Sequence, residues 1–232
     1  MNTELLKALD AYKLAQTEYK KAGDALKVAQ NNTSAIIDRV FAAGGPAERV
    51  EMRKANRDLL ESAGAAENAA KHDNSIAYAV VCVAGENVAQ AAANILLQAF
   101  NDDPKMAATP THYKKFEKFC AGLLGDRFHC FNTGYGFKVN YLDGLYGHNE
   151  IWVCDTKNGL IDTERYSQKQ IFDYETIKAE CVRAAADAAA LDAKIKELRE
   201  TFDANKKTYK TGARYLLPYV DYNAIHKNFD FE

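Results

Sequence analysis

A histidine and an aspartate flank a predicted β-hairpin in positions that suit acid–base chemistry. His148 begins one extended run, an Asn-Gly turn follows, and Asp162 lies near the end of the next run. On an antiparallel hairpin the two side chains can lie side by side, so that the carboxylate orients the imidazole. A nucleophile is then needed, and the candidate is Cys120 in the preceding predicted helix. The hypothesis assigns Cys120 as nucleophile, His148 as base and Asp162 as orienting group.

This set resembles the His and Asp half of transglutaminase-like and papain-like thiol enzymes. The resemblance covers roughly residues 111–166, and it implies a core of one helix followed by an antiparallel sheet. It also implies a cysteine hydrolase or deamidase activity. In those enzymes the nucleophilic cysteine stands at the start of the helix. Here the helix start carries Thr111-His112-Tyr113, and Cys120 comes about two turns later.

Cysteines and histidines gather in the same region, which raises the question of a metal site. The candidate ligands are Cys120, His129, Cys130, His148 and Cys154. Zinc sites normally have pairs of ligands two to four residues apart. The only close pair here is adjacent, and neighbouring side chains on a strand point to opposite faces. The sequence therefore favours ordinary thiols and histidines, with no metal and no cofactor.

Three tyrosines in or beside the predicted turns suit recognition of a protein. They are Tyr135, Tyr141 and Tyr146. Tyrosine offers a large apolar contact area and a polar tip, and it is enriched where proteins bind each other. The alternative is that these rings fill the core of a small domain, which needs aromatic side chains for burial.

The elements that position these residues form a compact region, predicted at residues 105–167. Apolar residues from Phe116 to Leu124 fall at helical spacing, and Gly125 is a plausible helix stop. Four short β-rich runs follow, at 127–131, 137–142, 150–154 and 160–166. Asn-Gly between the last two is a strong hairpin signal. One helix and a four-strand antiparallel meander are therefore expected.

Long helices are predicted on both sides of this head. Between about residues 3 and 43, a large residue recurs every seven positions, with alanine at most positions three places later. Such a repeat predicts a coiled-coil seam that a partner helix can approach closely. Gly44-Gly45-Pro46 marks a reversal before a second helix over about 47–100. Soft spots are expected at residues 30–34 and 71–75.

A third long helix is expected from Tyr174 to Tyr209, followed by an apolar tail that packs back on the stem. The predicted layout is a first stem part at 1–104, the inserted head at 105–167, and the returning stem helix and tail at 168–232. The fold class is α+β and mostly α. If head and stem are separable, deletion of the head leaves a soluble helical stem.

Composition narrows the classes of function. The 232 residues carry 30 basic and 32 acidic side chains, and this near-neutral balance argues against a general nucleic-acid binder, which needs a basic surface. The start of the chain lacks the pattern of a signal peptide. The longest apolar run, Ile76 to Ala84, is too short to span a bilayer. Five cysteines without regular spacing indicate thiols in a reducing, cytoplasmic setting.

Two hypotheses follow. The first is a non-enzymatic interaction module whose head grips a protein partner and thereby can inhibit it, with self-association through the alanine seams of the helical stem. This make-up is common among accessory proteins of phages and mobile elements that act on a host enzyme. The second is the thiol hydrolase or deamidase described above.

Overall fold

The computed structural model describes residues 2–42, 44–104, 106, 113–142 and 149–205. The chain divides into two compact units, Met1–Val182 and Arg183–Glu232. The predicted α+β class is confirmed. A long antiparallel helical pair carries a small head made of one helix and a four-stranded sheet.

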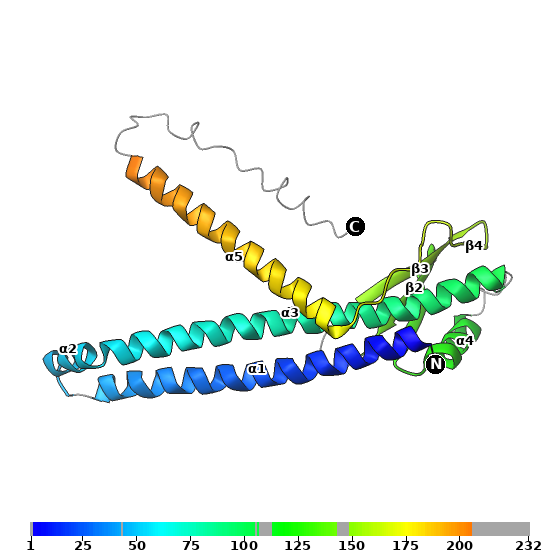
Figure 1. The fold of residues 1–232 in the computed structure, drawn as a ribbon. Helices are drawn as coiled ribbons and strands as arrows, with labels where there is room; N and C mark the ends of the chain where they lie inside the picture. Colours follow the sequence, from blue (N-terminus) through cyan, green and yellow to red (C-terminus); the bar gives the residue numbers. More distant parts are fainter. Residues whose placement is uncertain (1, 43, 105, 107–112, 143–148, 206–232) are drawn as a thin grey trace. The chain divides into compact units, whose positions relative to one another are not determined.

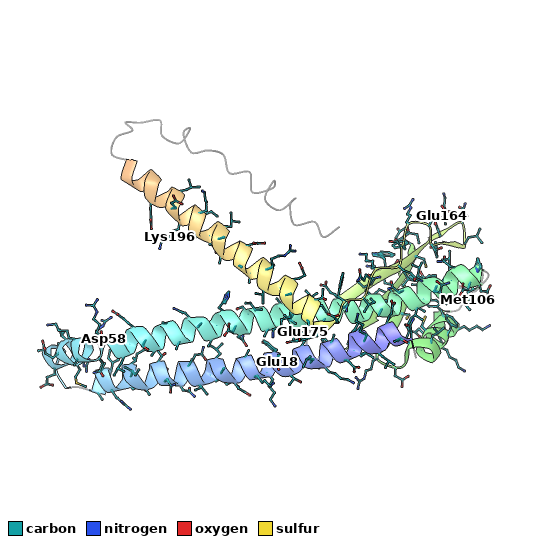
Figure 2. All side chains as sticks on the ribbon, in the orientation of Figure 1. Glu18, Asp58, Met106, Glu164, Glu175 and Lys196 are labelled. Atoms are coloured by element: carbon teal, nitrogen blue, oxygen red, sulfur yellow. The ribbon has the colours of Figure 1, made fainter. Side chains whose placement is uncertain are left out.

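Two long helices, α1 (Thr3–Ala42) and α3 (Arg57–Asp102), run side by side in opposite directions (Figure 1). The short helix α2 (Pro46–Ala55) joins them, with its proline in the first turn. Figure 2 labels Asp58 at the start of α3 and Met106 just beyond its end. The predicted large–small repeat of α1 is buried near its N-terminus, at Leu5, Ala8, Tyr12 and Ala15.

The helical pair is interrupted at a different place from the predicted soft spots. Residues 30–34 and 71–75 both lie inside unbroken helix. Ser75 does not cap a new helix, because its hydroxyl donates to the Lys71 carbonyl one turn back (2.9 Å). The break comes at Asn56, where the side-chain amide donates to the Met52 carbonyl (2.8 Å) and the backbone leaves helical geometry.

The head begins with α4 (Tyr113–Leu124), and Gly125 ends this helix with a φ of +88°. The four strands follow as a meander in the order β1-β2-β3-β4. Their bounds are Phe128–Asn132, Gly136–Tyr141, Asn149–Lys157 and Leu160–Asp162. The predicted Asn-Gly hairpin is confirmed: Asn158 and Gly159 take φ values of +52° and +76°.

Strand β4 is shorter than the predicted run at 160–166. Asp162 Oδ1 accepts a hydrogen bond from the Glu164 backbone N–H (3.1 Å), and Tyr166 N–H donates to the Thr163 carbonyl (3.0 Å). These local bonds turn the backbone away from the ladder. As a result β4 pairs with β3 only over residues 155–157.

The inner face of the sheet packs on the C-terminal half of α3, and α4 covers β1. Phe137 of β2 lies with its ring centroid 4.2 Å from that of Phe116 and 5.9 Å from that of Phe100. Tyr141 meets the edge of Tyr12 of α1 at 5.7 Å. One hydrophobic cluster therefore runs from the helical pair into the head. The division of the chain at residues 104 and 168 stays a prediction.

An extended segment, residues 163–173, leads back from the sheet along α3, and we call it the strap. Two asparagines of α3 hold its backbone. Asn94 Nδ2 donates to the Lys169 carbonyl (2.7 Å), and Lys169 N–H donates to Asn94 Oδ1 (3.2 Å). Asn87 makes the same pair of bonds with Phe172, at 2.8 and 3.3 Å. Each amide thus substitutes for the backbone of a neighbouring strand.

Helix α5 (Tyr174–Asn205) starts where the strap ends. Asp173 Oδ1 accepts from the Thr176 N–H (2.9 Å), which caps the first turn. Residues up to Val182 belong to the first unit, and the rest of the helix belongs to the second. The predicted end at Tyr209 and the predicted packing of the tail lie outside the described residues.

Among the described helices, α3 alone has the length and hydropathy of a membrane span. Within this fold, however, 72% of its most apolar stretch is buried. A core helix of a soluble protein has the same signature, so this is weak evidence for a membrane.

Candidate protein-binding site

The turn between β1 and β2 presents an exposed tyrosine on a fixed backbone. Tyr135 is 80% exposed, the highest value among the exposed large apolar side chains. Asn132 Oδ1 accepts from the Gly134 N–H (2.7 Å), and Gly134 takes a φ of +84°. The Tyr135 carbonyl accepts from the Thr156 N–H of β3 (2.7 Å). The backbone is therefore held in place while the ring stays in solvent.

Trp152, the only tryptophan of the chain, lies close to this turn. Gly136 follows Tyr135 in the chain and lies against the indole. A Cβ at position 136 would be 3.0 Å from Trp152 Cζ3 and 2.9 Å from Asp155 Cα. Any side chain there would also collide with the Cys154 carbonyl. Glycine is thus required for β2 and β3 to approach at the bulge between Phe137 and Lys138.

A lysine and a glutamate complete the surface around the indole. Lys138 Nζ lies 4.5 Å from the centroid of the Trp152 ring and 3.0 Å from Glu150 Oε2. The cation is therefore shared between a carboxylate and the ring face. Trp152 remains 37% exposed. We call Tyr135, Lys138, Glu150 and Trp152 the aromatic patch.

Of the three predicted tyrosines, the structure places only Tyr135 on an open surface. Tyr141 is a core residue with 4% exposure, and its ring packs against Tyr12 and Phe128 (5.7 and 5.2 Å between centroids). Tyr141 therefore fills the core of the head, which was the alternative interpretation of the tyrosines. Tyr146 lies outside the described residues.

The predicted catalytic set is not assembled by the part of the chain that the structure describes. Cys120 packs from α4 against Cys130 of β1, on the inner face of the sheet. Asp162 of β4 pairs with Asp155 of β3. Because neighbouring residues on a strand point to opposite faces, both aspartates lie on the opposite face of the sheet from Cys154 and Phe137. His148 lies outside the described residues.

The state of the thiols also argues against a nucleophile at Cys120. Its side chain is 1% exposed. The hydrogen bond with Cys130, together with burial, raises the pKa of Cys120 far above the usual range for a thiol. Burial raises the pKa of Cys154 to about 12. Nucleophilic cysteines need the reverse, a pKa lowered by nearby positive charge or a helix N-terminus.

We therefore expect the three thiols Cys120, Cys130 and Cys154 to react slowly in the folded protein. At pH 8, alkylation by iodoacetamide should be on the order of 100-fold slower than in the urea-unfolded chain, because labelling requires local opening. Peptide mass spectrometry after timed quenching measures each rate. A Cys120 that reacts as fast folded as unfolded would support the thiol-enzyme hypothesis instead.

No group of three or more metal-ligating side chains occurs among the residues that the structure describes. His129 and Cys130 are neighbours on β1, one exposed and one buried, as strand alternation requires. All five cysteines are among the described residues and are thiols. The absence of a metal stays an expectation.

Two parts of the site were missed by reading the sequence. Trp152 and Lys138 are brought together by the bulged pairing of β2 and β3, which the sequence does not show. The asparagines that hold the strap have a clearer signal. Asn87 and Asn94 stand one heptad apart in the alanine-rich and largely apolar second half of α3.

Comparisons with protein-family models, with curated proteins and with solved structures find no significant match to this chain.

Proposed function

We propose that this protein is a non-enzymatic interaction module that grips a protein partner with the aromatic patch of its head. The observation that carries the proposal is the exposed Tyr135 on a backbone held by hydrogen bonds to Asn132 and Thr156, beside a half-exposed tryptophan. The same contact would be the means of inhibition if the partner is an enzyme. Five thiols fit the reducing cytoplasm as its location.

Rigid aromatic side chains suit this role for a physical reason. Tyrosine and tryptophan bury a large area while losing little conformational entropy, because each has only two side-chain torsions. Tyr135 loses even less, since its turn is already ordered. Lys138 and Glu150 form an ion pair at the rim of the aromatic patch. Charges at a rim contribute more to the orientation of the incoming partner than to the affinity of the complex.

Replacement of the two aromatic residues tests the proposal. With the intact chain as bait in an extract of its own cells, the partner is captured, identified and titrated. Tyr135→Ser and Trp152→Ser should each weaken binding by about 2 kcal/mol or more, roughly 30-fold in Kd. Isothermal titration calorimetry measures the change.

Phe172→Ser is the matched control, since this ring is also half exposed but belongs to the strap. It should leave the affinity within about twofold. If the parent and both patch variants bind the partner with equal affinity and have the same circular dichroism, the aromatic patch is not part of the binding surface. Assay of the captured partner with and without the chain tests inhibition.

Self-association through the stem is the second part of the proposal, and a specific surface supports it. The closed end of the helical pair carries five exposed apolar side chains, which we call the hairpin tip: Ile37, Phe41, Val50, Met52 and Leu59. Helix α2 contributes no buried residue. Exposed apolar side chains gathered at one end of a helical pair can form an interface when they are covered by a second copy.

We expect Phe41→Ser combined with Leu59→Ser to weaken self-association, because the two largest exposed groups of the tip are lost. The dimer dissociation constant should rise by about 100-fold, from the apolar area no longer buried. Sedimentation velocity over a concentration series measures it. Leu14→Ser, at an exposed position nearer the start of α1, is the control. A parent chain that stays monomeric throughout would contradict the proposal.

A further inference from the structure

The third strand of the sheet has an edge without a partner strand. Strand β3 pairs with β2 from Asn149 to Asp155, but with β4 only from Asp155 to Lys157. Along the rest of that side, no described residue forms a backbone hydrogen bond with Glu150–Val153. Half of the N–H and C=O groups in an edge strand point outward, and they form a template for another strand.

A cavity of about 360 Å³ lies against this edge. Its lining comes from three elements of the first unit. Residues 150–153 of β3 form one side, Ser167 and Lys169 of the strap lie on another, and Ala93 and Leu97 of α3 line the third. Its size is at the lower end of the range for ligand pockets. We call this cavity the β3 slot.

The α3 and β3 walls of the slot pack on each other, and hydrogen bonds hold the strap wall in place. Asn94 holds the Lys169 backbone on both sides, and Gln168 Nε2 donates to Gln98 Oε1 (2.9 Å). Tyr166 OH donates to Asp155 Oδ1 at 2.8 Å, where β4 begins to pair. The strap is therefore held on α3, and the slot persists without an occupant.

We propose that the β3 slot accepts an extended segment of a partner protein, which pairs with β3 as an added strand. This inference deepens the proposed function, and rests on it, by specifying the form in which the partner is recognised. Backbone hydrogen bonds to Glu150–Val153 supply affinity regardless of sequence, and alternate side chains supply specificity. Every second residue of the segment faces Ala93 and Leu97, which requires a small apolar side chain there.

Charge specifies a further feature of the segment. Arg165 is engaged with Asp155 (3.4 Å) and Glu150 with Lys138 (3.0 Å). The Lys169 ammonium forms no ion pair with any described residue, while its backbone is fixed by Asn94. A carboxylate on the partner segment beside Lys169 would complete this end of the slot. The expected ligand is an extended, acidic peptide with alternating small apolar residues.

A displayed library of random seven-residue peptides, selected on the intact chain, tests this. We expect enrichment of peptides with an acidic residue and alternating small apolar residues. Ser167→Trp should reduce their binding at least tenfold, because the indole fills the slot from an exposed strap position. Lys169→Glu should reverse the preference from acidic to basic residues. Glu164, labelled in Figure 2, belongs to the strap but does not line the slot, so Glu164→Trp should change nothing.

The aromatic patch and the β3 slot share Glu150 and Trp152, and Tyr135 is the residue that separates them in the same assay. Tyr135 does not line the slot, so Tyr135→Ser should leave peptide binding unchanged even where it abolishes capture of the whole partner. Absence of any enriched peptide, or peptides that bind Ser167→Trp as well as the parent, would overturn the slot but not the aromatic patch. Hydrogen exchange gives an independent readout: bound peptide should slow exchange of amides within Glu150–Val153.

Discussion

Replacing both Asn87 and Asn94 by alanine should destabilise the protein by about 4–6 kcal/mol. Each change removes a buried side-chain amide and leaves one part-buried backbone N–H and one part-buried C=O of the strap without that partner. An unsatisfied buried group costs about 1–3 kcal/mol, and these part-buried groups are expected at the lower end of that range. The two sites are about 10 Å apart along α3, so their effects should nearly add. The total is a large part of the stability of a typical domain.

Urea unfolding measures this loss as a lower midpoint, and an unchanged slope shows that the same surface is exposed. Gln98→Ala is the matched control on the same helix, because its bond to Gln168 joins exposed side chains. It should lie within about 0.5 kcal/mol of the parent. Asn94→Asp keeps the shape and one acceptor but places a carboxylate against the Lys169 carbonyl, so it should also destabilise. A double alanine variant with the parent's midpoint would show that the strap is not held by these amides.

The helices of this protein could be predicted because their signal is local and repeated. Leu5, Ala8, Tyr12 and Ala15 satisfy the heptad and are buried. The break at Asn56 was missed because a single asparagine gives a weak signal, whereas 71–75 concentrates residues that often end helices. Ser75 and Thr33 instead bond to carbonyls one turn back, which helices tolerate.

The head could be predicted in outline, since the turn residues that define it act over two to four positions. Asn158-Gly159 and Gly125 take the positive φ values that their places require. Tyr141 could not be assigned from local signals, because its exposure depends on Tyr12, which is 129 positions earlier (141 minus 12). A strand residue before a turn is equally compatible with either face until the packing partner is known.

The candidate site was predicted least well, and the reason is the same. Trp152 lies beside Tyr135 only because the bulge at Phe137 and Lys138 shifts the register of β2 against β3. The β3 slot exists only because β4 ends after three residues. The position of Trp152 and the β3 slot both depend on where the hydrogen-bonded pairing of two strands is interrupted. Hydrophobic alternation in the sequence predicts paired strands but not the places where their pairing stops.

The second large effect concerns the core that the helical pair and the head share. Phe100 and Leu96 of α3 are buried, and Phe100 packs on Phe116 and Phe137 from the head (5.8 and 5.9 Å between centroids). At the start of α1, Tyr12 packs on Tyr141. Beyond this region the pair has few buried residues: α1 has only Val40 after Ala15. Most of the burial that stabilises the long helices therefore lies next to the head.

Deleting residues 105–167 and joining the ends with a short Gly/Ser linker should consequently abolish the cooperative thermal transition. Each of the large side chains lost from the core contributes about 3–5 kcal/mol, and several are lost together. Most of the stability of helices in proteins comes from such tertiary packing rather than from helix propensity. Circular dichroism should show gradual melting, and the exposed α3 face should bind an apolar dye. Phe137→Ala, which keeps the head, should lose about 3–5 kcal/mol and still melt cooperatively.

The same deletion decides how the chain is divided. From the sequence alone the deleted chain is expected to remain a folded, soluble stem, because its heptads continue on both sides of the head. From the shared cluster it is expected to unfold, because the heptads are buried mainly where the head covers them. A cooperative transition within a few degrees of the parent would establish residues 104 and 168 as true boundaries. Gradual melting would mean that the helical pair owes its fold to the core that it shares with the head.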